Sequence, residues 1–226
     1  MHGNSSCRAE SIDIVPFVLG ANMTMVTLDF AGCGKSEGDF ISLGWHERDD
    51  INVLVNYLRE QRKVNTIGLW GRSMGAATAL LHSHRDPTIA GLVLDSAFSD
   101  LRNLVQELAR THTKVPSFLV GAAMSLVRGS VESRANFDIY RLKPIEHLHE
   151  SFIPALFATG EQDTFIQPHH SQQMFAKYGG DKNFIKFDGD HNSQRPMFFY
   201  DSAVIFLIGT LQVEALLNEK NRMNEE

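Results

Sequence analysis

The sequence has few cysteines, no excess of positive charge and no long apolar run. Cys7 and Cys33 are its two cysteines in 226 residues; this is too few for a disulfide framework and favours a reducing compartment, so we predict a cytoplasmic protein. The net charge of −6 argues against nucleic acid as a partner. The longest apolar piece, Val115 to Val127, contains polar residues and a proline and falls short of the ~18 residues of a membrane span.

Internal repeats and low-complexity linkers are also missing from the sequence. Of the 226 residues, 43% are hydrophobic, which is enough for a full core. We therefore predict a single domain over residues 1–226. The segment 218–226 is charged, and we expect it to be a frayed tail.

Short apolar runs alternate with helical patterns along most of the chain. The strands that we predict are Met23–Phe30, Thr66–Trp70, Ala90–Asp95, Ile153–Thr159 and Asn183–Phe187. The helices that we predict are Cys7–Gly20 with a bend at Pro16, Trp45–Gln61, Met74–His84, Leu101–Arg110, His169–Tyr178, and a final helix that begins with Ser193 as its cap and runs toward Leu217. This alternation predicts an α/β fold with a mostly parallel sheet flanked by helices.

The alternation stops between Ser96 and Ser151. Here Leu101–Arg110 has a helical pattern, Val115–Val127 is apolar on most sides and Phe137–Leu148 is mixed. Two interpretations remain open for residues 97–151. The segment either packs as ordinary helices over the sheet or forms a small helical lid whose apolar helix lines an acyl pocket.

Gly71-Arg72-Ser73-Met74-Gly75 has the spacing of a nucleophile elbow. An apolar strand precedes Ser73 and a helix of small residues follows it, so its hydroxyl would stand on a sharp turn between the two. Gly71 and Gly75 fit this turn because a Cβ at either position would collide with it. The alternative is a glycine-rich turn whose serine only caps the helix.

Gly34-Lys35-Ser36-Glu37-Gly38 repeats the same spacing, but no helix pattern follows Ser36. The Gly-Lys-Ser triplet also suggests a phosphate-binding loop. That motif requires a glycine five positions before Gly34, where this chain has Asp29. Nucleotide binding is therefore a remote alternative.

A nucleophilic serine requires a base and an acid that orients the base. Asp163 follows the predicted strand Ile153–Thr159, and His191 follows the predicted strand Asn183–Phe187, in a Gly-Asp-His-Asn loop. We predict Ser73 as nucleophile, His191 as base and Asp163 as acid. Rival acids are Asp95, Asp190 and Glu161. Six other histidines lie in helical or polar contexts, and we expect them at the surface: His82, His84, His147, His149, His169 and His170.

The N-terminal His2-Gly3-Asn4 segment resembles the start of an oxyanion loop. We expect the backbone N–H groups of Met74 and Asn4 to form an oxyanion hole beside Ser73. An ordinary Gly-Asn turn is the alternative interpretation. No residue pattern assigns a metal or a cofactor.

Taken together, His-Gly-Asn-Ser-Ser, Asp-Phe-x-Gly-x-Gly-x-Ser-x-Gly, Gly-Arg-Ser-Met-Gly-Ala, Gly-x-x-Asp and Asp-His-Asn resemble the serine aminopeptidase S33-like branch of the α/β-hydrolases. Bem46-like proteins, the α/β-hydrolase domain 17 depalmitoylases and the monoacylglycerol lipases belong to this branch. The resemblance covers nearly the whole chain. It implies the α/β-hydrolase fold and a serine hydrolase that acts on esters, thioesters or, less often, amides.

The resemblance also implies about three strands before the His-Gly loop, and this sequence contains none of them. A slot between Met23–Phe30 and Thr66–Trp70 would then be unfilled, which is costly for backbone polar groups. We therefore expect that the sequence is truncated at its N-terminal side. Cooperative unfolding of this chain alone would contradict the idea that the missing strands are needed.

Two classes of function follow. The first is an active hydrolase that cleaves a small-molecule or acyl ester or thioester through an acyl-enzyme. The second is a non-catalytic or truncated hydrolase fold that binds or scaffolds. Contact with a membrane surface, the oligomeric state and the acyl length are left open by the sequence.

Overall fold

The computed structural model contains one parallel sheet of four strands, β1 (Gly68–Arg72), β2 (Gly91–Asp95), β3 (Ala155–Gly160) and β4 (Lys182–Phe187), in the order β1-β2-β3-β4. The structure describes residues 1–112 and 117–225. All four strands lie within a few residues of predicted ones. Every residue of β2 and β3 is buried, as expected for central strands of a parallel sheet that is covered on both faces.

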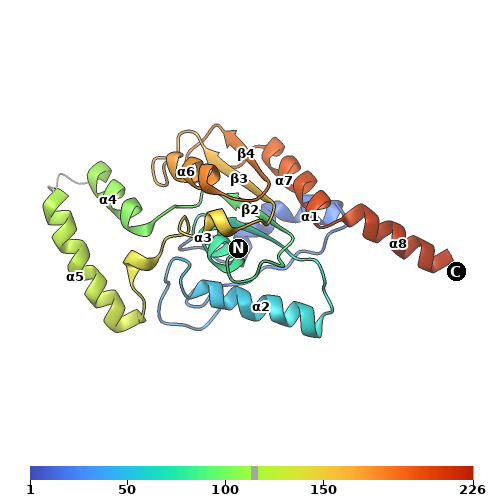
Figure 1. Cartoon of the computed structure of the whole chain (residues 1–226), viewed down its shortest axis with the longest axis horizontal. Helices are drawn as coiled ribbons and strands as arrows, with labels where there is room; N and C mark the ends of the chain where they lie inside the picture. Colours follow the sequence, from blue (N-terminus) through green and yellow to red (C-terminus); the bar gives the residue numbers. More distant parts are fainter. Residues whose placement is uncertain (113–116, 226) are drawn as a thin grey trace.

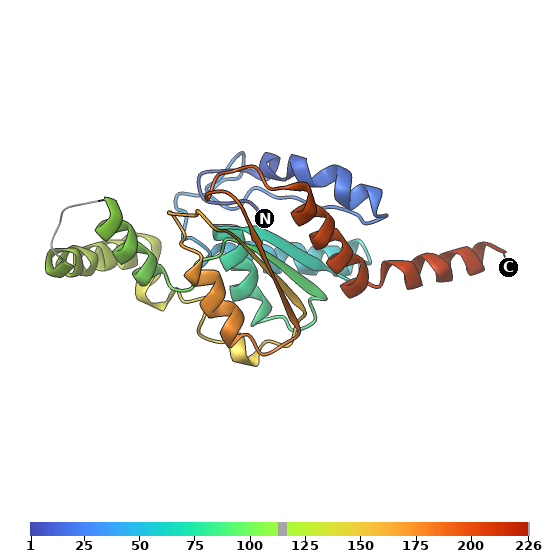
Figure 2. The same cartoon turned by 90° about the horizontal axis from the view of Figure 1, so that it is seen from above.

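Helices cover both faces of this sheet (Figures 1 and 2). Side chains alternate between the faces, so Leu92 and Leu94 of β2 point to one side and Val93 to the other. The first face packs against α2 (Glu47–Gln61), α3 (Met74–Ser83) and α6 (His169–Lys177). The second face packs against α1 (Val15–Gly20) and α7 (Met197–Thr210). The remaining elements are η1 (Arg8–Ile14), α4 (Leu101–His112), α5 (Ser117–Ala135), η2 (Ile139–Arg141), η3 (Leu148–Glu150) and α8 (Val213–Glu225).

The helices α4 and α5 form an arm at one side of the body, opposite α8 (Figures 1 and 2). Buried side chains of the arm, such as Leu104 and Met124, pack with Phe137 and with Ile166 from the body. The first two residues of the apolar piece Val115–Val127 lie outside the described residues. The rest of this piece, Ser117–Val127, belongs to α5.

The prediction of a strand over Met23–Phe30 is wrong, because this segment has no regular secondary structure and belongs to no sheet. β-Branched residues favour a pleated surface only where a neighbouring strand supplies a ladder. Some backbone donors here have side-chain partners instead: Phe30 N–H donates to His2 Nε2 and Ala31 N–H to Asp50 Oδ2.

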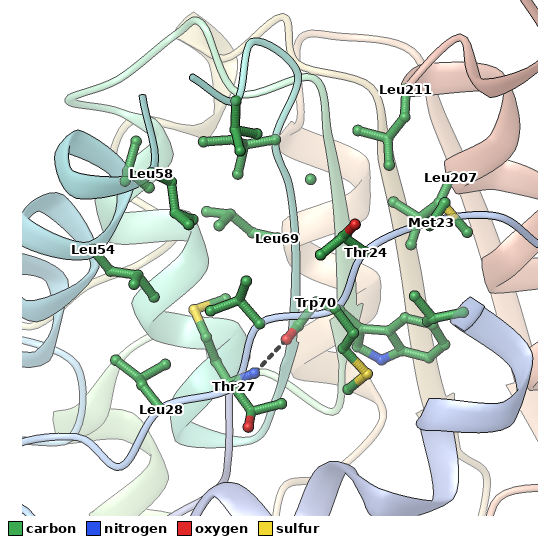
Figure 3. Close-up of a pocket in the computed structure, with 18 of the residues that line it drawn as sticks. Met23, Thr24, Thr27, Leu28, Leu54, Leu58, Leu69, Trp70, Leu207 and Leu211 are labelled. Atoms are coloured by element: carbon green, nitrogen blue, oxygen red, sulfur yellow. Dashed lines mark hydrogen bonds between the residues drawn. The ribbon is translucent and has the colours of Figure 1, made fainter. Parts of the chain in front are cut away.

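An apolar cavity of about 380 Å³ lies between Met23–Leu28 and β1, the end strand of the sheet (Figure 3). Leu54 and Leu58 of α2 line one wall, and Leu207 and Leu211 line the other. This cavity therefore lies where the resemblance predicts an unfilled strand position, between Met23–Phe30 and β1.

Met1 lines this cavity and pairs with β1. Its amine donates to the Trp70 carbonyl at 2.7 Å, and its carbonyl accepts from Arg72 N–H at 3.2 Å. These two bonds are the pattern of a parallel bridge opposite Gly71. Because backbone groups alternate along a strand, the N–H and C=O groups of Gly68 face the same side of β1 as the Trp70 carbonyl.

Both terminal helix predictions need correction. Cys7–Gly20 is not one helix bent at Pro16 but the 3-10 helix η1 followed by α1, with Pro16 in the first turn of α1. The final helix begins after Pro196 rather than at Ser193, whose hydroxyl instead bonds Asp190. It ends at Thr210, because Gln212 takes a φ of 54° before α8 begins. The segment that we expected to be a frayed tail continues α8 as a helix through Glu225.

Among the described residues, no single helix has the length and apolar character to cross a membrane. One bent pair, Met197–Thr210 with Val213–Arg222, meets both criteria only when its two helices are taken together.

Candidate active site

Ser73 stands on a sharp turn between β1 and α3, with a φ of 54° and a ψ of −118°. This conformation is strained for a residue with a side chain and points the hydroxyl away from the sheet. Two glycines make the turn possible. A Cβ on Gly71 would overlap the backbone of Gly75, and a Cβ on Gly75 would overlap the Met1 carbonyl. The elbow predicted from the sequence therefore has a steric requirement for both glycines.

A chain of hydrogen bonds joins Ser73 to His191 and Asp163. His191 Nε2 lies 3.1 Å from Ser73 Oγ, and His191 Nδ1 lies 2.7 Å from Asp163 Oδ2. The carboxylate accepts the proton on Nδ1, which leaves the lone pair of Nε2 facing the serine hydroxyl. All three residues are buried, and the Asp163 side chain is fully so.

The loops after β3 and β4 bring these groups together at the carboxyl edge of the sheet, where open α/β sheets place ligands. The second oxygen of Asp163, Oδ1, accepts from the backbone N–H groups of Phe165 at 2.9 Å and Ile166 at 2.8 Å. Phe165 also packs against the His191 ring, with 5.1 Å between ring centroids. The acid is therefore held by its own loop, and that loop covers the base.

The rival acids have other positions. Asp95 forms a buried ion pair with Arg195, at 2.8 Å from Nε to Oδ2. Asp190 accepts from the backbone of Asn192 and from Ser193. Glu161 is exposed. The structure thus places Asp163, and not these three residues, on the Nδ1 side of His191.

Arg195 is a site residue that the sequence analysis missed. Its guanidinium binds both oxygens of Asp95 and also donates to the carbonyls of Ser193 at 2.7 Å and His191 at 3.2 Å. The Asp95–Arg195 pair therefore ties the His191 loop to the end of β2. No spacing in the sequence links two residues 100 positions apart.

A second arginine, Arg72, holds the same loop from the other side. It donates to the His191 carbonyl at 2.6 Å and to Glu10 at 2.9 Å, and Glu10 accepts the Gly3 N–H at 2.9 Å. Burial alone would raise the pKa of Glu10, but hydrogen bonds from Ser6, Gly3 and Arg72 lower it below its usual value. Glu10 is thus an ionised link between the His-Gly segment and the His191 loop.

The His2 ring fixes the orientation of the segment expected to form the oxyanion hole. Its Nε2 accepts from Phe30 N–H at 3.1 Å, so its Nδ1 carries the proton and donates to the Gly3 carbonyl at 2.8 Å. In a trans peptide, the Asn4 N–H then points opposite to that carbonyl. Gly3 adjoins the elbow, since a Cβ built on it would lie 3.6 Å from Ser73 Cβ. Met74 begins α3 directly after Ser73, where backbone N–H groups are free for an anion.

A cleft of about 470 Å³ opens over Ser73 and His191. Most of the residues that line it are polar, among them Asn4, Glu10 and Arg72, and Phe165 adds a large aromatic side chain. No described residue of the segment 97–151 lines this cleft. Of the two interpretations of that segment, the one in which an apolar lid helix lines an acyl pocket receives no support from the described part of the chain.

Two histidine predictions are wrong, because His82 and His170 are fully buried. His82 faces inward from α3, and His170 packs at the start of α6 against Ser99. His84, His147 and His149 are exposed and His169 is half-buried.

The Gly34-Lys35-Ser36 loop contains a carboxylate where a phosphate-binding loop would hold a phosphate. Asp29 Oδ2 accepts the Lys35 N–H at 3.0 Å, and a Cβ on Gly34 would overlap this carboxyl group. Ser36 Oγ donates to the Asp29 carbonyl at 2.7 Å. These contacts explain the glycine-rich spacing as a carboxylate-filled turn.

A parallel sheet covered by helices, with a serine elbow and a histidine and an aspartate on the following strand ends, defines an α/β-hydrolase fold. The structure of an esterase from Pyrococcus furiosus has the same fold, with a TM-score of 0.74 at 21% identity over 93% of this chain and 81% of that one. Residues 2–124, more than half of the chain, match the family described as serine aminopeptidase, S33. The chain belongs to this family.

Among curated proteins, the chain is similar to YqkD of Bacillus subtilis, with 24% identity over 84% of this chain. It is also similar to Bem46 of Schizosaccharomyces pombe, with 24% identity over 80% of this chain. It spans only 63% of the length of YqkD and 56% of that of Bem46. The family match and the structural similarity agree on the α/β-hydrolase fold.

Proposed function

We propose that this protein is a serine hydrolase that cleaves an ester or thioester through an acyl-enzyme. The observation that supports this most directly is the buried chain from Ser73 Oγ through His191 to Asp163, with separations of 3.1 and 2.7 Å. A serine hydroxyl needs this arrangement of base and acid to become a nucleophile.

In the proposed reaction, Ser73 Oγ attacks the substrate carbonyl while His191 Nε2 takes the hydroxyl proton. Asp163 stabilises the imidazolium and keeps the ring oriented. The backbone N–H groups of Met74 and Asn4 bind the oxyanion of the tetrahedral intermediate. His191 then gives its proton to the leaving alcohol or thiol, and the acyl group stays on Ser73. A water molecule, deprotonated by His191, attacks the acyl carbonyl and releases the acid.

The polar cleft favours an ester whose acyl group is short, because the described lining offers one large aromatic side chain and no apolar tunnel. No metal or cofactor takes part in this scheme. The free thiols of Cys7 and Cys33 support our proposal of a reducing compartment such as the cytoplasm.

Hydrolysis of p-nitrophenyl esters from acetate to palmitate tests the proposal. We expect turnover that is highest for short acyl chains and lost in Ser73→Ala. Ser36→Ala is the matched control, because it changes the second Gly-x-Ser-x-Gly match in an unrelated loop. Turnover that survives Ser73→Ala would disprove the role of Ser73. A folded chain without turnover on any ester would favour the second class of function, a binding or scaffold protein.

A further inference from the structure

A hollow of about 280 Å³ lies at the end of α3 that is opposite to Ser73. It forms where the start of α2, the end of α3 and the segment 141–151 meet. Among the described residues that line it, one is acidic, Glu146, and four are cationic: Arg48, Arg85, Arg141 and Lys143. In a chain with a net charge of −6, this is a local concentration of positive charge.

Arg48, in the first turn of α2, forms no ion pair with any described residue. Its Cζ lies 3.9 Å from the centroid of the Trp45 ring, and its Nε is buried without a hydrogen-bond partner. Burial and then the positive charges of Arg85 and Arg141 lower the pKa of Arg48 to about 10, although Asp49 acts in the opposite direction. A half-buried cation that is crowded by two others is costly, and an anion in the hollow would relieve this cost.

The other cationic side chains are also available to a ligand. The Arg141 Cζ lies 5.8 Å from the centroid of the same Trp45 ring. Neither Arg141 nor Lys143 forms a side-chain hydrogen bond or an ion pair within the described part of the chain. Arg85 pairs with Asp49, but both side chains are exposed, and an exposed pair contributes little. Arg85 can therefore exchange this partner for an anion in the hollow.

The groups that would oppose an anion are already engaged or lie in solvent. Glu146 is exposed. Glu150 is outside the lining, with its Oε2 3.6 Å from His147 Nδ1. Carbonyls at the end of a helix also repel an anion, but the Leu80 carbonyl of α3 accepts from the Ser83 hydroxyl at 2.9 Å. The balance of charge in the hollow is therefore positive.

The donor set favours a phosphate group. A guanidinium binds phosphate through two parallel N–H···O bonds, and lysine adds a point charge. A carboxylate has one charge and two oxygens, whereas a phosphate monoester has nearly two charges and three acceptor oxygens. Leu81 and Pro144 also line the hollow and leave an apolar wall for a small organic group. The volume lies just below the ~300–1,000 Å³ of pockets for drug-sized ligands.

We propose that this hollow binds a phosphate monoester group, held by Arg48, Arg85, Arg141 and Lys143. The same group occurs in small soluble molecules and in the head group of phosphatidic acid, and the experiment separates these two sources. The proposal does not rest on the proposed hydrolase function.

The first arm is a calorimetric titration of the full 226-residue chain with glycerol 3-phosphate in a buffer without phosphate. We expect one molecule per chain. The affinity should fall at least about tenfold in Arg48→Met, which removes a charged donor. Binding should be lost in the double variant Arg141→Met with Lys143→Met. Far-UV circular dichroism verifies the folding of each variant. The double variant leaves the contact between Arg48 and Trp45 in place, so it decides the question if Arg48→Met does not fold.

Matched controls test the place and the chemistry of the site. Arg102→Met removes an exposed arginine whose Cζ lies 4.7 Å from the Tyr140 ring centroid, outside the hollow. Arg72→Met removes the arginine of the candidate active-site cleft. Both variants should keep the affinity of the parent chain for glycerol 3-phosphate. Acetate is the control ligand, and we expect it to bind at least about tenfold more weakly.

The second arm measures sedimentation with phosphatidylcholine vesicles that contain or lack phosphatidic acid. It uses Ser73→Ala, because phosphatidic acid has ester bonds that the proposed activity would cleave. Binding of glycerol 3-phosphate supports a soluble ligand, and binding only to vesicles with phosphatidic acid supports a lipid head group. Absence of binding in both arms would overturn the proposal. So would binding that persists in the double variant, binding that is lost in Arg102→Met or Arg72→Met, or equal affinity for acetate. None of these measurements depends on hydrolysis.

Discussion

The two sides of β1 differ in how completely they are built. At the carboxyl end of the strand, Ser73, His191 and Asp163 form one connected set, and Arg72, Glu10 and Arg195 hold the surrounding loops. Along its free edge, β1 faces a cavity of about 380 Å³ and pairs only with Met1 among the described residues. A densely hydrogen-bonded site therefore lies beside a loosely packed flank of the same strand.

Ser73 follows the end strand β1, but the other parts of the site are held by the inner strands. The loops of the site are anchored to the ends of β2, β3 and β4 and to one another. We expect substitutions at the site to have large effects, and substitutions along the cavity to have small ones.

The largest effect is expected for Gly71→Ala. Its Cβ would overlap the backbone of Gly75, which cannot move without breaking the elbow. We expect a loss of more than about 4 kcal/mol in the free energy of unfolding, or failure to fold. The matched control is Gly121→Ala in α5, where an added Cβ meets nothing within 4 Å; it should stabilise the chain by ~0.5–1 kcal/mol. Urea unfolding of both variants measures the contrast, and a mild effect of Gly71→Ala would contradict it.

Arg195→Met is expected to have the next largest effect. It leaves the buried Asp95 carboxylate without its ion-pair partner and with the hydroxyl of Ser96 as its remaining side-chain donor, at a cost of about 3–5 kcal/mol. Because Arg195 also holds the His191 carbonyl, kcat for an ester substrate should fall more than KM rises. Arg59→Met breaks the more exposed pair with Asp86 and should cost less than about 1 kcal/mol. Equal losses in the free energy of unfolding for the two variants would contradict the larger contribution of the buried pair.

Leucine-to-alanine substitutions compare the packed sheet with the cavity directly. Leu92 is fully buried in β2, so Leu92→Ala should cost about 3–5 kcal/mol. Leu58 lines the cavity beside β1, and its removal only enlarges an existing space. We expect Leu58→Ala to cost about 1 kcal/mol. Denaturant unfolding would refute the comparison if the two costs were similar.

A smaller effect is expected from pH at the β1 flank. Burial lowers the pKa of the Met1 amine from 8.0 to about 6. Between these values the unfolded chain binds more protons than the folded chain, so stability should rise by about 2 kcal/mol from pH 6 to pH 8. Acetylation of the amine removes this contribution. Unfolding curves at both pH values, with and without acetylation, measure it, and the same pH dependence in both forms would contradict the assignment.

The sequence predicted the parts of the site that local patterns encode. The elbow glycines restrict a single turn, and Asp163 and His191 each follow an apolar run that forms a strand. Arg195 and Glu10 act through contacts with residues 100 and 62 positions away, which no spacing reveals.

The errors in the predicted secondary structure have similar causes. Met23–Phe30 has the composition of a strand, but a strand also needs a partner, and composition says nothing about one. The break in the last helix depends on a positive φ at Gln212, a residue type that gives no signal for it. The prediction that His82 and His170 lie at the surface failed for the same reason, since both side chains are covered by elements that are distant in the sequence.

The most direct test of the central claim is labelling with a fluorophosphonate, which reacts with a serine only when a base activates it. We predict a single adduct, found on the peptide that contains Ser73, with labelling lost in Ser73→Ala and strongly reduced in His191→Ala. Ser36→Ala should label like the parent chain. Labelling that persists in Ser73→Ala, or a folded chain that does not react at all, would contradict the account.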